Sequence, residues 1–168
     1  WKQKSNERSC MTLSSFDVKT VAQNALIACL YAVLTLAIAP LAYSEIQFRI
    51  SEIIVFLAFY KRKWIPGLIA GCFLANLYSP LGLYDLVFGT LSTVLVTYAM
   101  SYLNNRYLAA LTGAIITGLI VGGELTLAFA TPLLLNVIYV ALGELGVLVI
   151  GAFIFGQIEN KEAFKKIL

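Results

Sequence analysis

Apolar residues fall into six stretches along this chain, and each stretch is separated from the next by polar residues, proline or glycine. Four of the stretches have the length of roughly 20 residues that a helix needs to cross the hydrocarbon core of a bilayer. The stretch over 50–60 is short, and the one over 66–79 opens on Pro66, which suits the first turn of a helix. The pattern predicts helices over residues 21–43, 50–60, 66–79, 83–103, 107–129 and 132–158.

Composition supports a membrane location for these helices. Hydrophobic residues make up 60% of the 168 residues and charged residues 12%, whereas about 25% of a soluble domain is charged. We therefore expect an all-α integral membrane protein, with six transmembrane helices in residues 20–158. Residues 1–19 form a predicted polar cytoplasmic leader in which Met11 is a candidate native start, and residues 159–168 form a predicted cytoplasmic tail.

The basic residues predict how the helices are oriented. Short cytoplasmic loops of membrane proteins carry an excess of lysine and arginine. Six spans with both termini in the cytoplasm place 11 of the 12 basic residues inside, and only Arg49 outside. If 50–60 did not cross, the cluster 61–63 and Arg106 would lie on opposite faces. The sequence therefore favours six spans, with the second and third short, tilted or irregular, in a multi-pass protein of the cell membrane.

Acidic and amide side chains inside the spans indicate a binding site, since an ionisable group in a membrane usually faces a cavity or a partner. Glu144 is about 12 residues into the last helix, or ~18 Å deep. The other predicted positions all lie toward the outer surface. The candidate ligand-binding residues are Gln47, Arg49, Glu52, Asn76, Asp85, Glu124, Asn136 and Glu144.

This asymmetry describes a cup that opens outward, because the inner half of the spans is almost purely apolar. Counted with Glu45, five acids face one arginine, an excess that a cationic ligand or protonation would relieve. Structural explanations exist for some of these residues. Arg49 and Glu52 can simply pair with each other, and Asp85 can be stabilised by a helix N-terminus.

The chain lacks the residues that several kinds of catalytic and metal site require. The chain has no histidine, which removes H-E-x-x-H zinc sites and Ser-His or Cys-His nucleophile pairs. It has no P-loop, so a partner must supply ATP hydrolysis if transport is energised. Its three cysteines form no C-x-x-C pair. We expect no enzyme activity, no metal, no cofactor and no nucleic-acid partner.

Small residues mark faces where helices approach closely. Gly67 and Gly71, and Gly118 and Gly122, have the small-x-x-x-small spacing, which more often reports packing within a chain than docking. The first helix carries the same spacing in alanine. Its candidate partner-binding residues are Ala25, Ala28 and Ala32.

Four segments together resemble the QueT family over about residues 20–158. These are Glu45-Ile46-Gln47-Phe48-Arg49-Ile50-Ser51-Glu52, Ile65-Pro66-Gly67 leading to Ala75-Asn76, Asp85-Leu86-Val87-Phe88-Gly89-Thr90-Leu91, and Ala141-Leu142-Gly143-Glu144. The resemblance implies a substrate-binding S component of an energy-coupling factor (ECF) transporter, with an S-component-like helix bundle. It also implies a partner module of two ATPases and a membrane scaffold, which Ala28 and Ala32 would contact.

The ligand that the resemblance implies is a queuosine precursor, 7-aminomethyl-7-deazaguanine or a related base. A carboxylate can accept two parallel hydrogen bonds from a guanine-like edge, and the ring carbonyl needs a donor such as Arg49, Gln47 or Asn76. Glu144 or Glu124 is expected to bind the base edge, and Asp85 or Glu52 to neutralise the ammonium group. The alternatives are an S component for another vitamin-like solute, a self-sufficient small secondary transporter or channel, and an intramembrane enzyme.

Overall fold

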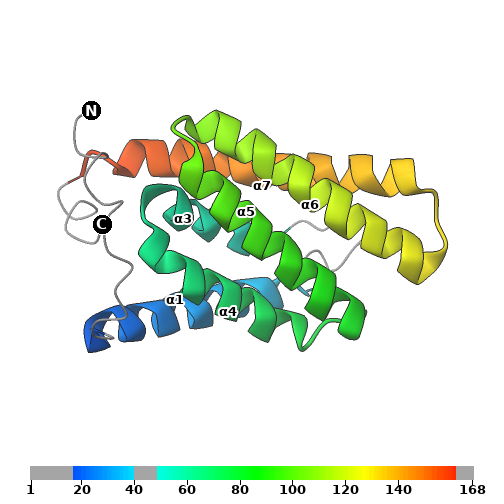
Figure 1. Cartoon of the computed structure of the whole chain (residues 1–168), viewed down its shortest axis with the longest axis horizontal. Coiled ribbons are helices and arrows are strands. Elements are labelled where there is room, and N and C mark those ends of the chain that lie inside the picture. Colours follow the sequence, from blue (N-terminus) through cyan, green and yellow to red (C-terminus); the bar gives the residue numbers. More distant parts are fainter. Residues whose placement is uncertain (1–16, 40–48, 162–168) are drawn as a thin grey trace.

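A computed structural model describes residues 17–39 and 49–161, and all regular secondary structure in these ranges is helical (Figure 1). Two 3-10 helices (η1 and η2) and one π-helix (η3) connect the α-helices. The elements in chain order are α1 (Val18–Ala37), η1 (Ile50–Val55), α3 (Phe56–Tyr60), η2 (Arg62–Trp64), α4 (Ile65–Asn76), η3 (Asp85–Gly89), α5 (Thr90–Tyr102), α6 (Arg106–Phe129) and α7 (Leu133–Ile158).

These elements form six helical segments at the predicted places, because η1 continues into α3, η2 into α4 and η3 into α5. The helices α1, α6 and α7 are each long and apolar enough to cross a membrane, whereas the segment Ile50–Tyr60 is apolar but short. The prediction that the second segment is irregular is confirmed, since its first half is a 3-10 helix. The all-α fold with several membrane-capable helices is thus established.

Local side chains explain where the helices begin. Asp17 caps α1 by accepting from the Lys19 amide at 3.3 Å, and Asn105 caps α6 by accepting from the amides of Tyr107 and Leu108. α1 ends at Ala37 rather than at the predicted residue 43. The helix ends there because Ile38 leaves helical geometry, with a φ of −119° and a ψ of 30°.

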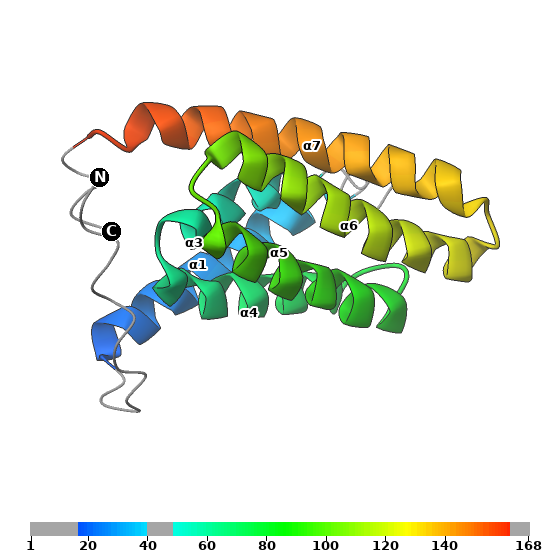
Figure 2. The same ribbon diagram turned by 45° about the horizontal axis from the view of Figure 1, so that its top comes forward.

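The helices pack as two closely associated pairs. α6 and α7 run antiparallel along their length, and α1 lies beside α4 (Figures 1 and 2). Glycines permit both approaches. A Cβ atom added to Gly122 would lie 2.7 Å from the Val137 Cα atom, and one added to Gly71 would lie 2.8 Å from the Ala28 carbonyl oxygen. The small-residue pairs on α4 and α6 therefore serve packing within the chain.

The first residues of α1 and the last residues of α7 lie at the same end of the bundle, together with the α3–α4 and α5–α6 connections (Figure 1). We call this the basic end. The basic residues among the described ranges gather there, with the exception of Arg49: they are Lys19, Lys61, Arg62, Lys63, Arg106 and Lys161. Partial burial above all, and then the charges of Lys61 and Lys19, lower the pKa of Lys63.

The interior changes character along the bundle. Toward the basic end it is an apolar core that includes Tyr31, Phe56, Leu68, Met100 and Leu148. Toward the opposite end the buried side chains become polar and charged. The segments that bring them together are the residues just before η1, the end of α4, and η3. Among residues 17–39 and 49–161, the fully buried charged side chains thus lie toward one end of the bundle.

Candidate ligand-binding site

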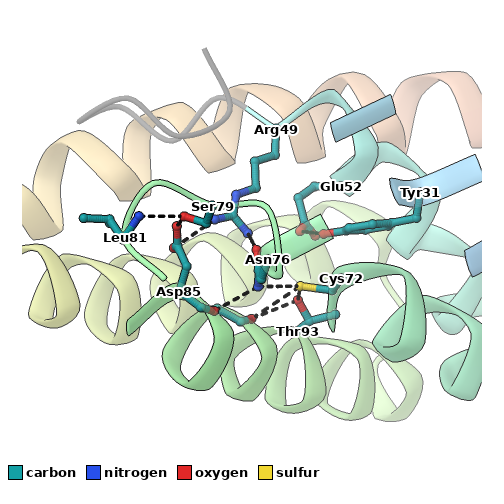
Figure 3. A network of polar contacts seen from close by, with 10 residues as sticks. Tyr31, Arg49, Glu52, Cys72, Asn76, Ser79, Leu81, Asp85 and Thr93 are labelled. Carbon is teal, nitrogen blue, oxygen red and sulfur yellow. Dashed lines mark hydrogen bonds and ion pairs between the residues drawn. The ribbon is translucent and has the colours of Figure 1, made fainter. Parts of the chain in front are cut away.

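Arg49 is the centre of a buried polar network that joins three helical segments (Figure 3). Its guanidinium group forms an ion pair with Asp85 at 3.2 Å and donates to the Asn76 side-chain oxygen at 3.3 Å. The Asn76 amide nitrogen in turn donates to the Asp85 backbone carbonyl at 2.9 Å. The side chain of Arg49 is 7% exposed and that of Asp85 is fully buried. A buried ion pair persists only when further hydrogen bonds satisfy its partners, and Asn76 is one of these partners.

The network continues on both sides of Asp85. The Ser79 hydroxyl contacts the second carboxylate oxygen of Asp85, and the Leu81 amide donates to Ser79 at 3.1 Å. Thr93 donates to the Gly89 carbonyl at 3.2 Å. Gly89 ends the π-helix, and a Cβ atom there would lie 2.7 Å from the Asn76 amide nitrogen. A side chain at this position would push Asn76 away from Asp85.

Glu52 is held from α1. The Tyr31 hydroxyl donates to the Glu52 carboxylate, and the hydroxyls of Thr35 and Ser51 lie 2.6 Å apart one turn further along α1. Tyr31 is fully buried and Glu52 is 6% exposed. These contacts fix the start of η1 against α1, so the Glu52 carboxylate has a defined position beside the Arg49 network.

A narrow cavity of about 10 Å³ lies between these segments and the two long helices α6 and α7. This is room for about one water molecule, so a larger ligand requires the surrounding side chains to move apart. Charged, hydroxyl and small apolar residues line it: Arg49, Glu52, Gly89, Ser92, Thr93, Val96, Thr117, Val121 and Glu144.

Glu144 and Glu124 are buried carboxylates with unused hydrogen-bonding capacity. Glu144 is 1% exposed, and one of its oxygens has no hydrogen-bond partner among the described residues. Glu124 is fully buried and neither of its oxygens has such a partner there. Leaving a buried polar atom unpaired costs free energy, and such atoms in a native protein commonly mark a functional site. Both side chains point into the protein rather than into lipid.

The predicted site residues divide into three groups in the structure. Arg49, Glu52 and Glu144 line the cavity. Asn76 and Asp85 bind the guanidinium group of Arg49. Glu124 lies close enough to Asp85 for the two charges to interact. Asn136 is elsewhere: it donates to Thr126 at 2.9 Å and to Thr131 at 2.7 Å at the α6–α7 corner. Gln47 lies outside the described residues.

Sequence reasoning missed the hydroxyl groups of the site. Ser92, Thr93 and Thr117 line the cavity, and Tyr31 holds Glu52. Three of them carry a sequence signal, since they are hydroxyl residues inside apolar helices. Ser92 and Thr93 lie on α5 and Thr117 on α6, and Ser92 donates to Thr117 at 3.2 Å. Isolated serines and threonines are common in membrane helices, so this signal is weak.

The predicted partner-binding alanines on α1 differ in exposure. Ala25 is exposed, Ala32 is half-buried, and Ala28 is 5% exposed. Ala28 packs against Gly71 of α4, since a Cβ atom added to Gly71 would lie 2.8 Å from the Ala28 carbonyl oxygen. Only Ala25 and the outer edge of Ala32 are thus open to another protein.

An all-helical bundle with membrane-capable helices and a buried cavity lined by charged side chains defines a membrane protein that binds or transports a solute. A family model described as QueT transporter matches residues 21–160. The chain is also 31% identical over 162 residues to the Queuosine precursor transporter QueT of Lactococcus lactis subsp. cremoris (strain MG1363), an alignment that covers 88% of this chain and 94% of that protein. The chain belongs to the QueT transporter family. It is therefore a multi-pass membrane protein of a family of transporters, and no solved structure matches it significantly.

Proposed function

We propose that this chain is the substrate-binding S component of an ECF-type ATP-driven importer and that it captures a queuosine precursor at the outer face of the cell membrane. The observation that carries the proposal is the cavity lined by Arg49, Glu52 and Glu144, in a chain whose relative is named a queuosine precursor transporter. The membership in a transporter family makes a binding and transport role, rather than catalysis, the expected one.

The chemistry of the cavity suits a guanine-like base. Glu144 offers a carboxylate oxygen that has no partner among the described residues, and a carboxylate can accept two N–H groups from one edge of such a base. Arg49 supplies the donor for a ring carbonyl. Ser92 and Thr117 add hydroxyl groups that can donate or accept. The bound base would be enclosed, because α5, α6 and α7 surround these residues.

The orientation we propose places the basic end in the cytoplasm, which agrees with the preference of lysine and arginine for cytoplasmic loops. The cavity network then lies in the outer half of the membrane. The scaffold of the ECF module would contact the lipid-facing side of α1, where Ala25 is exposed and Ala32 is half-buried. Ala28 contributes by letting α4 lie close behind that face.

Ligand titration tests the proposed substrate. The purified chain in detergent should bind 7-aminomethyl-7-deazaguanine or a related deazaguanine at least ~100-fold more tightly than riboflavin or thiamine, since each misplaced buried polar group costs about 1–3 kcal/mol. Guanine itself should bind with intermediate affinity. Equal affinity for riboflavin or thiamine would contradict the substrate and favour another vitamin-like solute.

A liposome experiment tests the need for a partner. The chain alone should bind the deazaguanine but not accumulate it, whereas the chain reconstituted with two ATPases and a membrane scaffold should accumulate it when ATP is supplied. Accumulation by the chain alone, driven by an ion gradient, would instead identify a self-sufficient secondary transporter.

A further inference from the structure

Glu124 is the buried acid that the arrangement of the network leaves unused. Among the buried acids of this end, Asp85 is paired with Arg49 and Glu52 accepts from Tyr31. Glu144 lines the cavity. Glu124 does not line it, no described group donates to either of its oxygens, and the Asp85 carboxyl group is the one with which it can share a hydrogen bond.

The position of Glu124 is nevertheless connected to the cavity. Thr117 and Val121 line the cavity from α6, and Glu124 follows on the same face of that helix, one turn closer to the opposite end. Its carboxyl group lies near Asp85 and within the electrostatic influence of Arg49. Arg49 also acts on Glu144. Arg49 therefore lies near both carboxylates, and it lines the cavity together with Glu144.

The distance between Glu124 and Glu144 follows from the packing of α6 on α7. Gly122 is level with Val137, since a Cβ atom added to Gly122 would lie 2.7 Å from the Val137 Cα atom. Glu124 lies two residues beyond Gly122 in one direction, and Glu144 seven residues beyond Val137 in the other. At a rise of 1.5 Å per residue, the two positions are roughly 13 Å apart along the bundle. This is a separation of backbone positions, and an elongated ligand that lies between them can contact one carboxylate with each end.

Charge indicates what Glu124 would bind. Four buried acids, Glu52, Asp85, Glu124 and Glu144, face the single guanidinium group of Arg49. An unpaired buried carboxylate is costly in its charged form. Next to the Asp85 carboxylate, Glu124 can form a hydrogen bond only if one of the two groups carries a proton, because two carboxylates are both acceptors.

From this geometry, and resting on the proposed function, we infer that Glu124 and Asp85 form a second subsite that binds a cationic arm of the ligand in exchange for a proton. The base edge lies at Glu144 and the arm extends past Arg49 toward Glu124. A flat bicyclic base with a short aminoalkyl arm, with a hydrogen bond of about 2.8 Å at each end, spans a distance of this order. The proton on Glu124 leaves to solvent as the ammonium group enters.

Calorimetry with two ligands tests this subsite. The probes are 7-aminomethyl-7-deazaguanine and a neutral deazaguanine that lacks the amine, each titrated in two buffers of different ionisation enthalpy. The wild-type chain should release about one proton more per molecule of the cationic ligand than per molecule of the neutral one. Its affinity for the cationic ligand should therefore increase more steeply from acid to neutral pH than its affinity for the neutral ligand.

Glu124→Gln should abolish this difference in proton release and weaken binding of the cationic ligand by roughly 10–100-fold, the usual loss for a charged hydrogen bond. Binding of the neutral ligand should not change. Glu144→Gln is the matched control, because it should weaken both ligands alike. An unchanged melting temperature of Glu124→Gln would show that the fold is intact, as expected for an isosteric change whose amide group can still donate to Asp85.

Two outcomes would overturn the inference, and they differ from a failure of the proposed function. If Glu124→Gln keeps the preference for the amine and releases the same number of protons, Glu124 is not the subsite. If the wild-type chain binds both deazaguanines equally, no cation subsite exists, although the proposed substrate class stands. Binding of neither deazaguanine would remove the proposed function and the inference together.

Discussion

The ion pair of Arg49 and Asp85 shows how single residues set the properties of the site. Both side chains are buried, the Asn76 side-chain oxygen accepts from Arg49, and the Ser79 hydroxyl contacts the second carboxylate oxygen of Asp85. The pair fixes the guanidinium group at the edge of the cavity. The main effect of the ion pair is therefore to position the Arg49 side chain, because a buried ion pair contributes little net stability of its own.

Removing one partner of this pair should be costly. We expect Asp85→Asn to lower the free energy of unfolding by about 3–5 kcal/mol, because it leaves the Arg49 charge buried without its counter-ion. Thermal or denaturant unfolding of the purified protein in detergent would measure the change. Asp17→Asn is the matched control: Asp17 is exposed at the start of α1, and asparagine caps a helix as well as aspartate. Equal stability of the two variants would contradict a buried ion pair.

At the scale of single residues, the sequence predicted which charged residues belong to the site but not which side chains they contact. Arg49, Glu52 and Glu144 stand out because charges are rare in apolar helices, and all three line the cavity. Tyr31 and Thr93 do not stand out, because tyrosine and threonine are common in membrane helices for other reasons. Their contacts depend on α1 and α5 lying against other segments, which no local pattern encodes.

Among the helices, α6 and α7 form the closest pair and carry the two unsatisfied carboxylates. Their separation is set by small residues, since Gly118 lies against Ala141 and Gly122 against Val137. The site geometry depends on this contact, because it fixes how far Glu124 lies from Glu144. A change in helix separation should therefore affect both stability and ligand binding.

Two adjacent glycines on α6 provide a test of this packing. Gly122→Ala should destabilise the protein by about 1–3 kcal/mol, because the new Cβ atom would meet the Val137 backbone at 2.7 Å. Gly123→Ala should be neutral or stabilising by up to about 1 kcal/mol, since nothing lies within 4 Å and alanine favours helix. Melting temperatures of the two variants would decide. The packing described here would be wrong if Gly123→Ala were the more damaging change.

All six helical segments were predicted from the apolar pattern, but the kinds of helix were not. The 3-10 helix over Ile50–Val55 and the π-helix over Asp85–Gly89 contain the residues that contact Arg49, Asn76 and Tyr31. Hydrogen bonds to distant segments decide these backbone conformations. Hydrophobic periodicity reports burial and is insensitive to the difference between helix types.

The molecule as a whole is asymmetric along its long axis. An apolar core lies toward the basic end, and buried charges lie toward the opposite end. A solute could thus enter the polar end while the apolar end stays closed. This arrangement suits a subunit that receives a ligand on one side of the membrane and needs other proteins to release it on the other.

The proposed orientation can be tested by labelling single cysteines in cells. In a background with Cys10 and Cys29 replaced by alanine, a membrane-impermeant maleimide should label Leu83→Cys in intact cells, because Leu83 is 76% exposed at the end opposite the basic one. Lys161→Cys, at the basic end, should be labelled only after the membrane is permeabilised. Cys72 is fully buried and should not react. The reverse labelling pattern would contradict a cytoplasmic basic end.

The proposed function requires a ligand bound against Glu144 in the cavity between η1, α5, α6 and α7. Calorimetric titration of the purified wild-type chain, Glu144→Gln and Glu159→Gln with 7-aminomethyl-7-deazaguanine tests it most directly. We predict that Glu144→Gln weakens binding by roughly 10–100-fold through the loss of charged hydrogen bonds. Glu159→Gln, the same change at the basic end where Glu159 pairs with Arg106, should bind like the wild type. Undiminished affinity in Glu144→Gln would contradict the account.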